Sequence, residues 1–369
     1  MALTLHGTVS DNTVVLDRRS AKPIIINGDM QVAQRGTSTT GITTSGYYTV
    51  DRFAVTISAL GTWTQTQDTT VPTAKGFTKS LKMDCTTADA SPAAGDLVLL
   101  SYKVEAQDLQ LLKYGTSSAE AFTLRFHVRS PKTGTHIVHI YQNDGARHIS
   151  KAYTISSADT FQEVIINIPG DTGGTVNNDN ACGMQIEFYL AAGSNSTSGT
   201  LATSWAGYAQ ANSAVGQVNC ADSTDNNFFI TGLQMEVGTF DANSIAPFQH
   251  ESYGDSLLRC QRYCYKILND TGGTKYTTIG LAQGTGRGYG VWQFNEMRTA
   301  PTVSLSNVAE FLPLNGAGAP QADFTTVTGS NSTKTMMLFD LSGSSGLTSG
   351  QACAIGMKDG ESILATSEL

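Results

Sequence analysis

One tetrapeptide in this sequence has the form of a catalytic nucleophile. Gly254-Asp255-Ser256-Leu257 is the nucleophile motif of one esterase family. A serine hydroxyl is a poor nucleophile without a base, and that family supplies the base from a histidine further along the chain. No histidine follows His250 here. We therefore interpret the tetrapeptide as a turn and N-cap before a helix, and we predict no catalytic residue and no enzyme activity.

Groupings that could bind a phosphate or a metal ion lack the necessary context. The glycine-rich run at 284–290 precedes a strand-like segment, whereas a phosphate-binding loop precedes a helix, so a turn is predicted. His136 and His139 lie three residues apart on a predicted strand and point to opposite faces, which prevents them from sharing a metal ion. We expect both to be solvated or at the edge of the core. No metal site and no cofactor is predicted.

The cysteines and the carboxylates are interpreted as structural. Cys260 and Cys264 fall one turn apart on a predicted helix without further ligands, so all six cysteines are expected to be buried free thiols, as in a reducing cytoplasm. A carboxylate pair for glycoside cleavage is defined by the fold and not by sequence spacing. The acidic residues on predicted strands are interpreted as outward-facing charges: Asp84, Glu105, Glu163 and Glu187.

Aromatic residues in or beside polar loops are the remaining candidates for a site. Sugars present apolar C–H faces and polar edges, so proteins bind them with flat rings beside amides, carboxylates and hydroxyls. Five residues are candidates for such a glycan-binding platform: Tyr47, Tyr48, Trp63, Trp205 and Tyr208.

The composition favours strands over helices. Of the 369 residues only 15% are charged and 37 are glycine, a pattern typical of strands joined by polar turns, so the fold class predicted is all-β. The net charge of −8 comes without a basic stripe, which argues against nucleic acid as a partner. The N-terminus lacks the features of a signal peptide, and no apolar run is long enough for a membrane span, so we expect no export signal and no membrane insertion.

Short alternating apolar runs separated by turn residues fill the chain from 23 to 254. They predict a β-sandwich with one or two helical turns at 106–112. Residues 255–369 start with a predicted helix at 255–267, and weaker strands follow, which we interpret as a smaller β-domain. Residues 1–22 are too short to form a core of their own and are interpreted as an N-terminal docking arm. The predicted strands of the sandwich lie at 52–57, 80–84, 97–104, 122–128, 136–140, 163–168, 185–190 and 230–238.

Two sequence blocks resemble a known family. They comprise residues 26–37 with 48–53, which include Asp51 and Arg52, and residues 230–238 with 246–248 and 253–263. Together they resemble the opening and closing strands of the jelly-roll, carbohydrate-binding-module-like domains of tailed-phage fibres and other tail proteins. The start Met1-Ala2-Leu3-Thr4-Leu5 also resembles the opening of some cyanophage tail-fibre proteins. Asp51 and Arg52 are expected to be structural, without a bond between them, because adjacent strand residues point to opposite faces.

This resemblance implies a non-enzymatic virion protein, assembled in the host cytoplasm. A tail fibre or appendage of this kind docks to other virion proteins (tail, collar or capsid) and presents a jelly roll for adhesion to host-surface polysaccharide. Two alternatives remain open: a structural assembly or decoration protein that binds no glycan, and a polysaccharide depolymerase. By analogy with phage fibres we expect a homo-oligomer, specifically a homotrimer, with subunit contacts in residues 1–22 and in the C-terminal domain.

Overall fold

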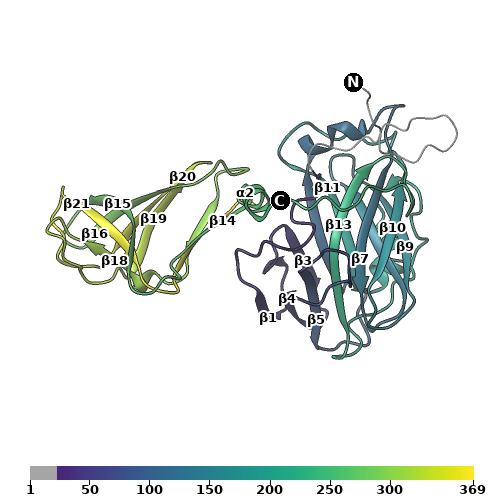
Figure 1. The fold of residues 1–369 in the computed structure, drawn as a ribbon, viewed down its shortest axis with the longest axis horizontal. Coiled ribbons are helices and arrows are strands. Elements are labelled where there is room, and N and C mark those ends of the chain that lie inside the picture. Colours follow the sequence, from purple (N-terminus) through teal and green to yellow (C-terminus); the bar gives the residue numbers. More distant parts are fainter. Residues whose placement is uncertain (1–22) are drawn as a thin grey trace, which may run out of the picture.

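The computed structural model describes residues 23–369, except for the side chains of residues 328 and 329. The docking arm predicted at 1–22 lies outside the described residues. Residues 23–237 contain two large antiparallel sheets packed face to face, and residues 264–366 contain two smaller sheets. Figure 1 shows the smaller sheets projecting from one side of the sandwich, with a short helix between the two parts. The all-β fold class is confirmed.

The first large sheet, sheet A, contains six strands. In spatial order these are β1 (Ser38–Ile42), β4 (Thr62–Asp68), β5 (Ser80–Thr87), β13 (Asn227–Val237), β7 (Phe122–Arg129) and β10 (Gln162–Ile168). Sheet B contains β12 (Ala206–Gly207), β9 (Arg147–Ile155), β8 (Gly134–Gln142), β11 (Cys182–Ala192), β6 (Leu97–Glu105), β3 (Phe53–Ser58) and β2 (Gly46–Tyr47). Short helices η1 (Ala106–Leu112), α1 (Ser194–Thr197) and η2 (Gln210–Asn212) lie in the connections.

The strand pairings define a jelly roll. β5 pairs with β13, β6 with β11, β7 with β10 and β8 with β9, so the chain forms nested antiparallel pairs. These pairs alternate between the sheets, because β5·β13 and β7·β10 belong to sheet A while β6·β11 and β8·β9 belong to sheet B. An antiparallel ribbon folded over in this way is the double Greek key of a jelly roll. The predicted jelly-roll sandwich is thus confirmed.

Period-two patterning explains why these strands bury one face. On β7, Phe122, Leu124, Phe126 and Val128 are all buried in the core between the sheets. The Phe126 ring meets the Phe188 ring of sheet B edge-on, with centroids 5.0 Å apart. Each fully buried side chain of this size stabilises the fold by about 1.5–3 kcal/mol. The predicted helical turns are found as η1, whose Leu109 and Leu112 are buried.

The helix of the joint is shorter than predicted. α2 spans Tyr253–Cys260 and is capped by Ser252, whose hydroxyl accepts the N–H of Asp255. Ser256 therefore lies inside the helix and is not its N-cap. The predicted extension to residue 267 is wrong, because residues 264–268 form strand β14 (Cys264–Leu268), which pairs with β22 (Ser362–Thr366). Cys260 and Cys264 accordingly do not share one helix.

Two smaller sheets form the C-terminal part. Sheet C contains β14, β22 and β17 (Thr302–Leu305). Sheet D contains β18 (Phe311–Leu314), β21 (Ala352–Met357), β15 (Lys275–Ala282), β16 (Arg287–Gln293), β20 (Met336–Ser342) and β19 (Thr326–Ser332), and a single turn, η3 (Val308–Glu310), precedes β18. Their shared core is built around Trp292, Phe339 and Ile355. The glycine-rich run at 284–290 forms the turn and start of β16, as predicted.

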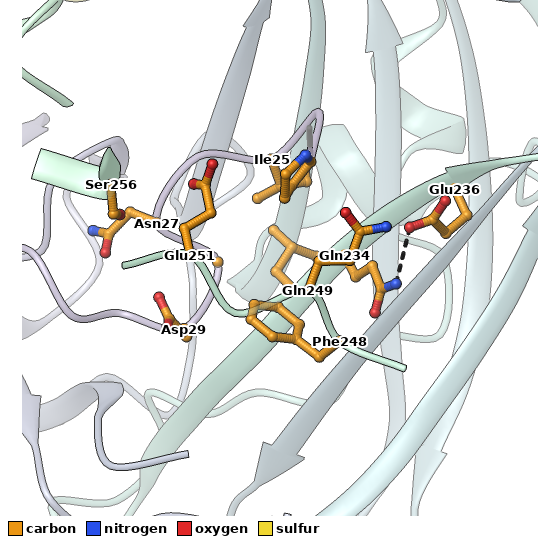
Figure 2. Close-up of a pocket in the computed structure, with 12 residues that line it drawn as sticks. Ile25, Asn27, Asp29, Gln234, Glu236, Phe248, Gln249, Glu251 and Ser256 are labelled. Carbon is orange, nitrogen blue, oxygen red and sulfur yellow. Dashed lines mark hydrogen bonds between the residues drawn. The ribbon is translucent and has the colours of Figure 1, made fainter. Parts of the chain in front are cut away.

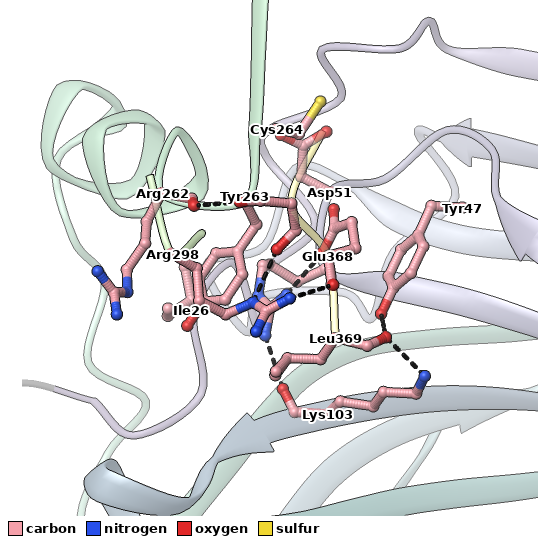
Figure 3. Close-up of polar contacts among 12 residues, drawn as sticks. Ile26, Tyr47, Asp51, Lys103, Arg262, Tyr263, Cys264, Arg298, Glu368 and Leu369 are labelled. Carbon is pink, nitrogen blue, oxygen red and sulfur yellow. Dashed lines mark hydrogen bonds and ion pairs between the residues drawn. The ribbon is translucent and has the colours of Figure 1, made fainter. Parts of the chain in front are cut away.

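Buried charges tie the jelly roll to the C-terminal part. Arg52 is 1% exposed and donates to Glu368 Oε2 at 2.7 Å and to the backbone oxygen of Lys103 at 2.6 Å. Its guanidinium also lies 3.3 Å from the centre of the Tyr263 ring. The carboxylate of Asp51 accepts instead from Gln34. Asp51 and Arg52 thus bind different partners, as predicted, and Figure 3 shows this group of polar contacts.

Glu105 is a second anchor of this joint. Its carboxylate accepts from Arg262 Nε and Nη2, at 2.7 and 2.8 Å, and from the hydroxyl of Tyr263 at 2.5 Å. Although burial acts to raise the pKa of Glu105, the hydrogen bonds from Arg262 and Tyr263 hold that pKa below its usual value. The prediction that Glu105 faces outward is wrong, because β6 ends against the segment that follows α2. Asp84 and Glu163 do lie at outward-facing positions of their strands.

Candidate functional site

The structure separates the five aromatic candidates. Trp63 is fully buried in the jelly-roll core and donates its indole N–H to the backbone oxygen of Leu60, so it cannot stack on a sugar. Tyr47 belongs to the joint, where its hydroxyl donates to the backbone oxygen of Leu369. The correction for Trp63 has a simple cause: the sequence shows polar neighbours, but the tertiary fold determines whether a ring is covered. Tyr47 is half-buried.

The other three candidates differ in how accessible they are. Tyr48 is half-buried and closes a local turn through a hydrogen bond from its hydroxyl to the backbone oxygen of Thr44. Trp205 packs edge-on against Tyr114 and donates its indole N–H to Pro169, which leaves its ring half-buried. Tyr208 is 46% exposed. Tyr208 is therefore the candidate that fits a ligand-facing position best.

Tyr208 forms an aromatic platform together with Tyr141. Tyr208 follows β12 at the edge of sheet B, where its N–H donates to Ala146. Tyr141 lies on β8 and points to the outer face of that sheet, because Ile140 and Gln142 beside it are buried on the inner side. The two ring centroids are 5.0 Å apart at an interplanar angle of 67°. We call this pair the Tyr141–Tyr208 platform.

A chain of hydrogen bonds beneath the platform fixes its position. The N–H of Ala209 donates to His148 Nε2 at 3.4 Å, so the proton of neutral His148 is on Nδ1. That nitrogen lies 3.1 Å from His139 Nε2, which makes His139 the acceptor and leaves its own proton on Nδ1. The proton on His139 Nδ1 is donated to Glu187 at 2.7 Å. One neutral tautomer of each imidazole satisfies the whole chain, which ends in a carboxylate.

The sequence did not predict this chain of hydrogen bonds. His136 and His139 do point to opposite faces of β8, as predicted, with His136 stacked on Tyr153 and His139 bonded to Glu187. The expectation of solvated or core-edge histidines is wrong, because both are almost fully buried. His139 and Glu187 meet through the register of β8 with β11, where they lie directly opposite each other. Residue spacing in the sequence carries no signal for that register.

Polar side chains continue from the platform across sheet B. Tyr141 lies opposite Gln185 on β11, and Gln185 lies opposite Lys103 on β6. Gln185 and Lys103 are half-buried, so part of each remains at the surface. In the next row Glu187 lies opposite Ser101, whose buried hydroxyl has no hydrogen-bond partner within the described part of the chain. Rings beside an amide, a carboxylate, an ammonium and a hydroxyl are the groups that saccharide binding needs.

The imidazole of His148 is uncharged near neutral pH. Burial, together with the neighbouring His139, lowers the pKa of His148 to about 4. Burial also lowers the pKa of His127, on the outer side of sheet A, to about 4. Burial raises the pKa of the Tyr208 hydroxyl, which therefore remains a hydrogen-bond donor. The face thus offers neutral donors and acceptors beside the charges of Glu187 and Lys103.

We expect stability to fall as the pH is lowered from neutral. In the unfolded chain a histidine titrates near 6.5, whereas folded His148 titrates near 4. Between these values the unfolded state binds more protons, so the free energy of unfolding decreases as pH falls from about 6.5 to about 4. Urea unfolding at pH 7 and pH 5 measures this change. A His148→Gln variant should show a shallower dependence, and equal dependences would contradict the assignment.

A narrow pocket lies where the two sequence blocks of the jelly roll meet. Its lining includes Asn27 and Asp29 from the first block and Gln234 and Glu236 from the second, and it reaches Ser256 on α2. Figure 2 shows Ser256 and Asn27 at one end and Glu236, bonded to Gln234, at the other. Among the described residues the buried Ser256 hydroxyl has no hydrogen-bond partner, and no histidine lines this pocket. The acidic side chains in the lining are Asp29, Glu236 and Glu251.

A second hollow, about 220 Å³ in volume, lies on the outer side of sheet A. The rings of Phe77, Phe248 and His250 pack against one another at its wall, with centroids 4.8 to 5.4 Å apart. Arg125 lines it too, but its guanidinium is bonded to Glu163 and to the backbone oxygen of Ala246. The guanidinium of Arg125 is thus directed at the protein.

All six cysteines are free thiols in the structure. Five cysteines are buried free thiols, as expected, whereas Cys182 is half-buried. Burial raises the pKa of Cys182 to about 11, so it is protonated at neutral pH.

Within residues 23–369, no helix is long and apolar enough to cross a membrane.

Comparisons with known proteins show distant likeness to several β-rich folds. No protein-family model matches this chain, and no curated protein matches it. Among solved structures, the enzymatically active domain of tailspike protein 4 from bacteriophage CBA120 is similar over 58% of this chain, with 14% identity and a TM-score of 0.31. The match spans only 21% of that tailspike chain.

Two sugar-related structures are also similar to this chain. A putative sugar binding protein from Bacteroides thetaiotaomicron aligns over 58% of this chain and 100% of its own, with 12% identity and a TM-score of 0.32. The family 11 carbohydrate-binding module from Clostridium thermocellum, solved with a mixed-linked tetrasaccharide, aligns over 58% and 94%, with 12% identity and a TM-score of 0.25. These TM-scores are all low, so we base the function of this chain on its own residues.

Proposed function

We propose that this chain is a non-enzymatic glycan-binding protein whose jelly roll holds saccharides on the outer face of sheet B. The observation that carries the proposal is the Tyr141–Tyr208 platform. Hydrogen bonds that run from His148 through His139 to Glu187 hold the platform in position. A sugar ring stacks on Tyr208 and directs its hydroxyls to Gln185 and Glu187, whereas the Lys103 ammonium is bonded to the backbone oxygen of Leu369 at the joint. Gln185 and Glu187 both lie on strand β11, which holds their positions better than a loop does.

The virion part of the proposal rests on sequence. Residues 26–53 and 230–263 resemble the jelly-roll domains of tailed-phage tail proteins. We propose a tail fibre or appendage that docks to other virion proteins and adheres to host-surface polysaccharide. We assign Ser256 no catalytic role, because no histidine follows His250 in the sequence to act as the base of the esterase motif.

We expect Tyr208→Ala to weaken glycan binding at least about tenfold, because an exposed aromatic anchor contributes well over 1 kcal/mol at a binding site. The measurement is calorimetric titration with the glycan that the wild-type protein binds best on an array. Tyr253→Ala is the matched control, since Tyr253 is exposed on α2, outside the platform. Equal affinities for wild type and Tyr208→Ala, with unchanged folding, would contradict the proposed site.

A further inference from the structure

Exposed large apolar side chains gather on sheet D. Among the described residues this sheet carries Ile279, which is 77% exposed, together with Leu281, Val291 and Met336. Tyr276 and Val327 of the same sheet are also exposed. A group such as Ile279, Leu281, Val291 and Met336 on one small sheet is unusual, because exposed apolar residues on a soluble protein are normally scattered. Figure 1 shows β15, β16 and β21 at the end of the molecule far from the jelly roll. The jelly roll therefore does not cover them.

Strand register places these side chains on one face. Ile279 lies opposite Ala354, which in turn lies opposite Leu314. Val291 lies opposite Leu338, and the pair Gly280–Gly290 brings Ile279 and Val291 into neighbouring positions. Residues directly opposite each other in a sheet share a face. An apolar row thus crosses β18, β21, β15, β16 and β20, while the inner face of the sheet packs into the core around Trp292 and Phe339.

The charges on this face are already paired. Arg287 Nε donates to Asp340 Oδ1 at 2.7 Å across β16 and β20. Arg287 and Asp340 are the charged strand residues that share this face, and their charges cancel. A partner of either net charge would gain no complementary contact here. An equally flat and uncharged surface fits this face best, and a second copy of the chain supplies one.

The size of the face also suits a pair. Six strands about 4.8 Å apart and about seven residues long cover roughly 700 Å². A standard interface buries about 800 Å² on each partner. We propose that the outer face of sheet D, around Ile279 and Val291, docks onto the same face of a second copy of this chain. Two sheets packed face to face in this way form a two-fold sandwich across the interface.

This proposal is independent of glycan binding. It agrees with the prediction that subunit contacts involve the C-terminal domain, but a flat face pairs with one equivalent face, whereas the sequence resemblance favoured a homotrimer. The proposal therefore specifies two copies for the contact through sheet D.

The test is the mass of the full chain in solution, by sedimentation and native mass spectrometry, for wild type and Ile279→Asp. We expect a dimer for the wild type and at least an about 30-fold larger dimer dissociation constant for Ile279→Asp, because the charge would be desolvated in an apolar interface. Val291→Asp should act in the same way. Leu258→Asp, at an exposed position of α2, is the matched control and should remain dimeric.

Circular dichroism and the melting temperature show whether each variant is folded. Because Ile279 is 77% exposed within one chain, we expect Ile279→Asp to fold normally. A monomeric wild type, a trimer, or a dimer that persists in folded Ile279→Asp and Val291→Asp would each overturn the proposal.

Discussion

We expect Arg52→Ala to lower the free energy of unfolding by about 3–5 kcal/mol, because removal of one partner leaves a buried ion pair uncompensated. Glu368 would lose its shortest cationic contact, and the backbone oxygen of Lys103 would lose its donor. The Tyr263 ring would lose the guanidinium that covers it. Urea unfolding of the full chain measures the loss.

Arg52→Ala should also change how the two parts of the chain unfold. Because Arg52 joins the jelly roll to the C-terminal part, its removal should also separate the two parts into distinct unfolding transitions. Lys334→Ala is the matched control, since it breaks an exposed pair with Glu296 and should cost less than about 1 kcal/mol. A change of similar size in both variants would show that the joint is not stabilised in the way the contacts indicate.

We expect Trp63→Ala to destabilise the jelly roll by about 3–5 kcal/mol, the range for removing a large aromatic side chain from a core. Trp63 is fully buried, and its loss leaves a cavity between the sheets as well as a backbone oxygen at Leu60 without its donor. Urea unfolding followed by far-UV circular dichroism measures this change.

Trp63→Phe provides the comparison, because it keeps most of the apolar volume and should cost less. In the sequence, Trp63 was also a candidate for stacking on a sugar ring. If Trp63→Ala instead kept full stability and lost glycan binding, the buried position of this residue would be wrong.

Much of the jelly roll was predictable because its central strands bury one face. The alternation Phe122, Leu124, Phe126 and Val128 predicts β7 directly, and β6 and β11 are predicted in the same way. β4 was not predicted, because Trp63 is the single large apolar residue of a strand whose other buried side chain is Gln65. The end of α2 was also misplaced, since β-strand pairing with β22 overrides local helix preference from residue 264 onward.

The site was predictable only in part. Tyr208 could be proposed from its polar surroundings, and its exposure agrees with that role. The pair His139 and Glu187 is separated by 48 residues and forms through strand register. Glu105 and Arg262 are separated by 157 residues and meet only when both parts of the chain have folded. Long-range pairing of this kind depends on topology, which local sequence patterns do not specify.

An array of bacterial surface polysaccharides and defined oligosaccharides, probed with the labelled full chain, tests whether this protein binds glycans. We predict a signal on a limited set of glycans, which Tyr253→Ala retains and Tyr208→Ala loses. If the folded wild-type chain binds none of the arrayed glycans, while a known carbohydrate-binding module on the same array does, the result would contradict the proposed function.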